Sequence, residues 1–187
     1  RRFLVDLLLF LAPLGLGAAY VEWRLSQIPN SYTQKRDIIE TAGVDARVVV
    51  LGSSRELNGI SPAEFDCSGV NLANVSESLF YSAEVMRRQL RVGRHLRLAI
   101  QGLSHVSYEF QTGDSSEAWR GLYYRRFLGA NLDGSMTRFD ARNVSLIALY
   151  GQKWVLDFAA KGFDVNLSAG MNERGWSALL DKGTDPT

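Results

Sequence analysis

The chain has 187 residues, of which 46% are hydrophobic, 22% charged and 11% aromatic. This balance is that of a packed globular domain and excludes a disordered tail. Lys and Arg total 21 against 20 Asp and Glu, so no strong field would attract nucleic acid, and we expect no nucleic-acid partner. With one cysteine, Cys67, and two histidines, His95 and His105, we expect no disulfide framework, no metal site and no cofactor.

The N-terminal residues form one apolar stretch. Residues 3–21 read FLVDLLLFLAPLGLGAAYV, and at about 1.5 Å per residue such a helix nearly crosses a hydrocarbon core of about 30 Å. We therefore predict a single-pass transmembrane helix, with residues 1–24 as the anchor and residues 25–187 as one α/β domain. A cleaved signal peptide is the alternative, because small residues end the stretch. Gly15 and Gly17 offer a face that another transmembrane subunit could approach closely.

The charges around this stretch predict its orientation. Arg1 and Arg2 precede it, whereas Glu22 and Arg24 nearly cancel after it. Short flanking segments rich in Lys and Arg stay on the cytoplasmic side. We therefore expect an anchor in the inner (cytoplasmic) membrane, with the lipid bilayer as a partner and the soluble domain on the periplasmic or extracytoplasmic side.

Beyond the anchor, strand and helix patterns alternate. The run RVVVL at 47–51 is β-branched and bounded by Asp45 and Gly52, which predicts a strand buried on both faces. Two further strands are predicted, at residues 70–73 and 96–103. Helices are predicted near residues 31–42, 116–127 and 139–160, and one more is predicted between a cap at Asn74 or Ser76 and its end at Gly93. This alternation predicts a right-handed parallel sheet in an α/β sandwich.

The helix after the second strand carries an apolar stripe formed by Leu79, Ala83, Met86 and Leu90. Their spacing predicts that this stripe faces the core. The helices at 116–127 and 139–160 are likewise predicted to face the core. The arginines between residues 87 and 97 are interpreted as a solvated face, with an acidic glycan, an anionic lipid or an acidic subunit as the alternative partner.

A serine stands where chemistry is expected. Gly52, Ser53 and Ser54 directly follow the first predicted strand, and open α/β sheets place their sites at the carboxyl ends of strands. A serine held in such a turn can act as a nucleophile, with nearby backbone N–H groups stabilising an oxyanion. The alternative is a serine that only caps the following helix.

Three segments extend this pattern: VVVLGSSRELNGISPAEF, NLANVSESLFY and LRLAIQGLSHVSY. Together they resemble the SGNH/GDSL hydrolase superfamily, and most closely its membrane-anchored, extracytoplasmic members associated with envelope-polymer acylation. The resemblance covers roughly residues 32–129. It implies a flavodoxin-like, SGNH-type three-layer sandwich with a parallel sheet, incomplete at its C-terminus.

The resemblance also implies roles for individual residues. Ser54 matches the nucleophile. Ala73 stands where the family has an oxyanion-hole glycine, and Ser104 stands where it has an oxyanion-hole asparagine. An alanine can still donate its backbone N–H, whereas a serine hydroxyl is shorter than an amide and donates only one hydrogen bond.

The family's general base has no clear counterpart. Its late Asp-x-x-His tetrapeptide does not occur in the 187 residues, and His105 is only a weak candidate for the base. Because a serine without a base is a poor nucleophile, two hypotheses remain. The first is a catalytically degenerate SGNH-like domain that serves as an accessory or interaction subunit of a membrane complex. The second is a serine esterase or O-acyltransferase acting on an envelope polymer such as a glycan, with its general base outside the given chain.

Overall fold

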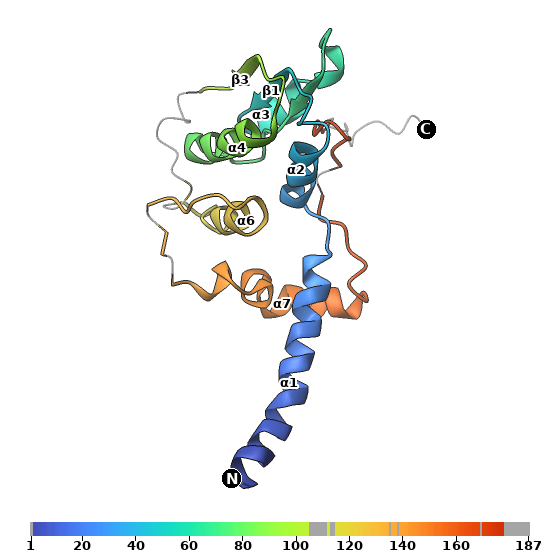
Figure 1. Ribbon diagram of the computed structural model, residues 1–187, viewed down its shortest axis with the longest axis vertical. Coiled ribbons are helices and arrows are strands. Elements are labelled where there is room, and N and C mark those ends of the chain that lie inside the picture. The colour runs from blue at the N-terminus through green and yellow to red at the C-terminus, as the bar shows by residue number, and fades with distance from the viewer. Residues whose placement is uncertain are drawn as a thin grey trace, which may run out of the picture. The chain divides into compact units, whose positions relative to one another are not determined.

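The computed structural model describes residues 2–104, 112, 115–134, 136–137, 139–168 and 170–177. The chain is a mixed α/β protein that divides into two compact units (Figure 1). The first unit contains residues 1–29 and 139–167, and the second contains residues 30–138 and 168–187. The sequence predicts a boundary near residue 24, whereas the structure also groups residues 139–167 with the N-terminal helix.

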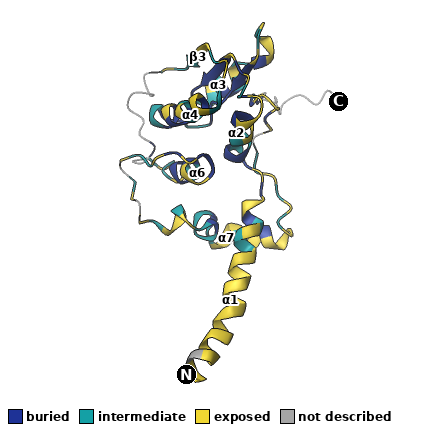
Figure 2. Cartoon of the chain, viewed as in Figure 1, coloured by how far each residue is buried: buried dark blue, intermediate teal, exposed yellow. Residues whose placement is uncertain are grey.

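The first unit is built on helix α1 (Arg2–Ser26), which confirms the predicted apolar helix. Its segment Val5–Ser26 is long and apolar enough to cross a membrane by length and composition. Most of its apolar side chains are exposed, whereas Leu25 near its C-terminal end is buried (Figure 2). The same unit contains the 3-10 turn η3 (Ala141–Asn143) and helix α7 (Leu146–Ala160). Helix α7 is interrupted at Gly151, whose φ of 77° departs from helical geometry.

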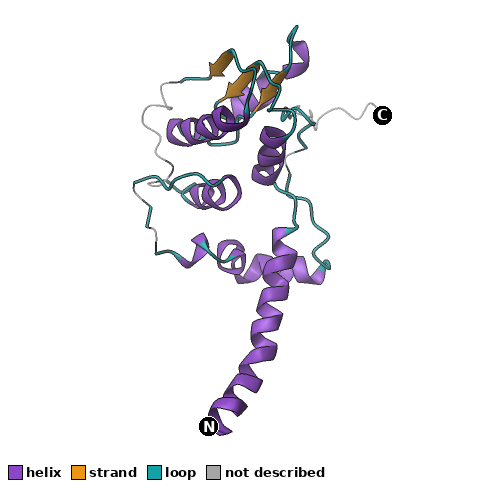
Figure 3. Ribbon diagram, in the orientation of Figure 1, coloured by secondary structure: helices purple, strands orange, loops and turns teal. Residues whose placement is uncertain are grey.

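The second unit contains a small parallel sheet (Figure 3). Its strands are β1 (Val48–Leu51), β2 (Gly69–Asn71) and β3 (Leu98–Gln101), in the order β2-β1-β3. Val49 of β1 lies opposite Val70 of β2 and Ala99 of β3, and both pairings are parallel. The predicted parallel sheet is thus confirmed, with β1 central and buried along its whole length.

Helices α2 (Ser31–Glu40), α4 (Leu79–Val92) and α6 (Trp119–Leu128) meet through buried tyrosines. The ring of Tyr124 stacks on that of Tyr81 with centroids 4.4 Å apart, and it meets the ring of Tyr32 edge-on at 4.9 Å. Such pairs contribute about 0.5–1.5 kcal/mol beyond the burial of their area. This tyrosine cluster joins three helices that are distant in sequence.

The predicted core face of α4 is wrong. The buried residues of α4 are Tyr81, Ser82, Glu84, Val85 and Gln89, whereas Leu90 is 59% exposed. The reason is that polar side chains on the buried face have partners: Gln89 Nε2 donates to the carbonyl of Gly43 at 2.6 Å, and Glu84 Oε2 accepts the Asn131 N–H at 2.8 Å. Hydrophobic spacing does not register such hydrogen bonds.

The other two helices predicted to face the core do so only in part. In α6 Leu122 and Phe127 are buried, but Trp119 is half exposed. In α7 Tyr150 and Phe158 are buried, whereas Trp154 is 55% exposed.

Strand β2 ends at Asn71, two residues before its predicted end, because the Asn71 side chain turns the chain. Its Nδ2 donates to the carbonyls of Glu56 and Ile60 at 2.7 and 2.9 Å, and its Oδ1 accepts the Ala73 N–H at 3.0 Å. Asn71 is fully buried. One side chain therefore satisfies three backbone groups in the interior.

We expect Asn71→Leu to lower the free energy of unfolding by about 3 kcal/mol or more, because buried polar groups left without partners cost about 1–3 kcal/mol each. Asn172→Leu is the control: its Oδ1 accepts two backbone N–H groups, but it lies at the surface, where water can replace it. Unfolding of the full chain in detergent, followed by circular dichroism, measures both. Equal losses in the two variants would contradict the role of Asn71.

Candidate functional site

The candidate site lies where β1 ends and helix α3 (Ser54–Gly59) begins. Gly52 turns the chain with a φ of 139°, a conformation that side-chain-bearing residues rarely adopt. Ser53 then occupies the N-cap position and Ser54 the first helical position, and both are half-buried. The predicted strand–turn–serine geometry is therefore present in the structure.

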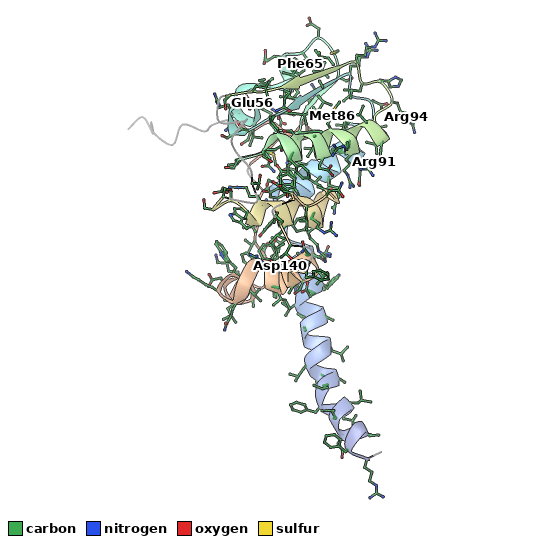
Figure 4. All side chains as sticks on the ribbon, turned by 90° about the vertical axis from the view of Figure 1, so that its left-hand side faces the viewer. Glu56, Phe65, Met86, Arg91, Arg94 and Asp140 are labelled. Carbon is green, nitrogen blue, oxygen red and sulfur yellow. The ribbon has the colours of Figure 1, made fainter. Side chains whose placement is uncertain are left out.

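The carboxylate of Glu56 fills this turn. Its Oε2 accepts hydrogen bonds from the Ser53 backbone N–H at 2.7 Å and from the Ser53 hydroxyl at 3.1 Å. A Cβ added to Gly52 would lie 2.5 Å from Glu56 Oε2, and one added to Gly102 would lie 2.0 Å from Glu56 Cδ. Two glycines from the ends of β1 and β3 thus make room for the Glu56 side chain, which is labelled on α3 in Figure 4.

The segments that carry the predicted site residues meet at one edge of the sheet. The Asn74 N–H donates to the carbonyl of Gly52 at 3.1 Å, and the Gly102 N–H donates to the carbonyl of Leu51 at 3.0 Å. The segments that follow β1, β2 and β3 are thereby tied together. Ser54, Ala73 and Ser104 stand on these three segments.

The individual candidates differ in their surroundings. Within the described residues the Ser54 hydroxyl makes no hydrogen bond, while the Ser54 carbonyl accepts one from Asn58 Nδ2 at 2.7 Å. Ala73 is fully buried, and its N–H is already donated to Asn71 Oδ1. Ser104 is half-buried, three residues after the end of β3. His105, the weak candidate for the base, lies outside the described residues.

The other histidine is remote from the site. His95 precedes β3, and its Nε2 lies 3.9 Å from Asp45 Oδ1, which precedes β1. Both side chains are largely exposed. Because they precede parallel strands, they stand at the opposite edge of the sheet from Ser54. Among the described residues, no three His, Cys, Asp or Glu side chains come together as a group that could hold a metal ion.

Two ionisable side chains, Lys35 and Glu77, are buried near the Gly52 turn. Glu77 accepts hydrogen bonds from the Tyr124 and Ser82 hydroxyls, each at 2.6 Å. Lys35 Nζ donates to the carbonyls of Asn71 and Gly175, each at 2.7 Å. Both charged side chains are buried, and no spacing pattern in the sequence indicates either of them.

Burial sets the protonation of this pair. Burial raises the pKa of Glu77 to about 7, although hydrogen bonds from Ser82, Tyr124 and the Gly52 backbone favour its charged form. Burial lowers the pKa of Lys35 to about 7, while the charge of Glu77 acts in the opposite direction. The backbone of Gly52 is hydrogen-bonded to Glu77, so Glu77 is linked directly to the turn that presents Ser54.

No family model, no curated protein and no solved structure matches this chain. The site consists of a serine at the carboxyl end of a central parallel strand, beside a carboxylate that the same turn holds in place.

We expect Gly102→Ala to be destabilising because the new methyl group would displace the Glu56 side chain and deprive the Ser53 N–H of its acceptor. In a Glu56→Ala background the same substitution should cost much less. The double-mutant cycle should therefore give a coupling of about 1–3 kcal/mol, measured by thermal unfolding of the full chain. A coupling near zero would mean that Glu56 does not occupy this space.

The raised pKa of Glu77 predicts a pH dependence of stability. Between pH 5 and 6.5 the folded chain keeps the Glu77 proton, whereas the unfolded chain releases it, so stability falls as pH rises, by up to about 1.4 kcal/mol per pH unit. Lys35 is protonated in both states over most of this range. Glu77→Gln should therefore flatten the profile of unfolding free energy against pH, and a variant with the wild-type slope would refute this assignment.

Proposed function

We propose that this chain is a membrane-anchored, catalytically degenerate SGNH-like domain that acts as an accessory or interaction subunit of a larger membrane complex. In this proposal the second unit is the core of a flavodoxin-like three-layer sandwich. Helix α1 holds it to the inner membrane, with the sheet on the periplasmic or extracytoplasmic side. The strand order β2-β1-β3 and the serine after the central strand support the SGNH-like part of the proposal.

One observation carries the loss of catalysis: the carboxylate of Glu56 is fixed in the turn that presents Ser54. Acyl transfer at a serine develops a negative charge on the substrate oxygen, which needs N–H donors and no neighbouring anion. Here the Ser53 N–H is donated to Glu56 and the Ala73 N–H to Asn71. These two N–H groups therefore have partners within the chain and are not free to bind an oxyanion.

The anchor supports the interaction role. Most apolar side chains of α1 are exposed, and nothing within 4 Å would meet a side chain added at Gly15 or Gly17. Small residues on a transmembrane helix allow the backbone of another helix to approach closely. Other transmembrane subunits are accordingly the proposed partners of α1.

A specific observation favours the second candidate function, a serine esterase or O-acyltransferase acting on an envelope polymer. The Ser54 hydroxyl is half-buried at the end of the central strand and makes no hydrogen bond within the described residues, so it is available to a base from elsewhere. In that case the base would come from outside the described part of the chain.

We expect the full-length protein to resist labelling by a fluorophosphonate probe. A reaction that depends on Ser54 would show that the hydroxyl is activated, and the degenerate assignment would then be wrong. The measurement compares wild type with Ser54→Ala and with Ser53→Ala, which removes the neighbouring hydroxyl as a matched control. Labelling that Ser54→Ala abolishes and Ser53→Ala retains would establish the hydrolase-type alternative.

The accessory role predicts a partner that depends on the anchor. Membrane subunits should co-purify stoichiometrically with wild type and with Ser54→Ala, and should be lost when residues 3–21 are replaced by an unrelated transmembrane helix. A wild-type protein that purifies from mild detergent without any stoichiometric partner would contradict the role.

A further inference from the structure

Helix α7 is tied at its beginning to the end of α1. The Glu22 carboxylate of α1 accepts hydrogen bonds from the Leu146 N–H at 2.9 Å and the Ile147 N–H at 3.2 Å, and also from the Ser145 hydroxyl. These are the free N–H groups of the first turn of α7, where the helix dipole also favours a negative charge. Glu22 therefore fixes the N-terminus of α7.

The other end of α7 is tied to the same turn of α1. The Arg24 guanidinium donates to the carbonyl of Gly162, just after α7, and lies over the Phe163 ring at 5.2 Å. A cation at a helix C-terminus again matches the dipole. Glu22 and Arg24 thus bind the two ends of α7, and we call this pair of contacts the clamp.

This clamp sets the level of α7 along α1. Glu22 and Arg24 directly follow the apolar stretch of residues 3–21, and Figures 1 and 4 both show α7 running across α1 near its C-terminal end. Tyr20 and Trp23, at the same level, are more than half exposed. Aromatic rings of this kind concentrate at the boundary between acyl chains and headgroups.

Helix α7 is rich in apolar residues and yet largely uncovered. Its 15 residues include two charged ones, Lys153 and Asp157. Trp154 is 55% and Leu156 59% exposed, and Val144, just before the helix, is 74% exposed. Large apolar side chains that are exposed together mark a surface that contacts a partner or a membrane. At about 1.5 Å per residue its length is well short of a hydrocarbon core of about 30 Å.

We propose that α7 is an interfacial membrane helix, seated between headgroups and acyl chains of the leaflet in which α1 ends, with Trp154 and Leu156 in contact with lipid. The proposal rests on the membrane anchoring of α1 proposed above. Lipid is the occupant because α7 is clamped to the end of the apolar stretch of α1. Its exposed apolar surface is therefore continuous with the one that α1 presents to the bilayer.

Spin labels on the full-length chain in phosphatidylcholine liposomes test this placement. In a Cys67→Ser background, single cysteines at Leu156, Asp157 and Leu9 carry the label. Relaxation by oxygen, which concentrates among acyl chains, is compared with relaxation by a water-soluble nickel chelate. At position 9, within α1, oxygen should dominate. At position 156 oxygen should also dominate, and the label at the neighbouring charged position 157 should be more accessible to the nickel chelate.

The two proposals fail in different ways. A water-exposed label at position 9 would overturn the anchoring itself. A lipid-exposed label at position 9 with equally water-exposed labels at 156 and 157 would overturn the interfacial placement of α7 alone. The latter result is also expected if a protein partner, absent from the liposomes, covers α7.

A second measurement uses the native residues. Brominated lipids quench the fluorescence of tryptophans that touch acyl chains. Trp154→Phe should remove part of the quenching seen with wild type, whereas Trp119→Phe, in the α/β unit, should not. Quenching that is unchanged by Trp154→Phe would place Trp154 away from the acyl chains and overturn the proposed contact.

Discussion

The carboxyl edge of the sheet depends on the hydrogen bonds of one buried amide, that of Asn71. Its side chain takes up the carbonyls of Glu56 and Ile60 and the N–H of Ala73. Its own carbonyl accepts from the ammonium group of Lys35. Backbone groups that leave a sheet lose their ladder partners, and in a buried place they must find others. Asn71 supplies these partners, so the turns after β1 and β2 keep fixed positions.

The backbone N–H groups at the candidate site also have partners within the chain. Gly52 donates its N–H to Glu77, and Ser53 donates to Glu56. Each bond takes up a backbone N–H group of the turn that follows β1. The N–H groups of Gly52 and Ser53 therefore already have partners within the chain. This pairing of donors is the basis of the accessory role proposed above.

In the first unit, charged side chains supply the partners that the Asn71 amide supplies in the second. Glu22 and Arg24 complement the two ends of the α7 dipole, so a segment more than a hundred residues away in sequence returns to the end of α1. The unit made of α1 and α7 therefore carries exposed apolar surface on two helices that meet at one level. In the placement proposed above, this surface is the one that contacts the bilayer.

The sequence by itself determined the features that local pattern controls: the apolar helix α1, the β-branched strand β1, the parallel pairing implied by alternating elements, and the serine after Gly52. The tertiary structure decided which polar side chains are buried. Gln89 on the buried face of α4, and the pair Lys35 and Glu77, have partners from segments far away in sequence, and hydrophobic periodicity carries no information about them. The same holds for Glu56, whose place depends on two glycines that only the folded sheet brings together.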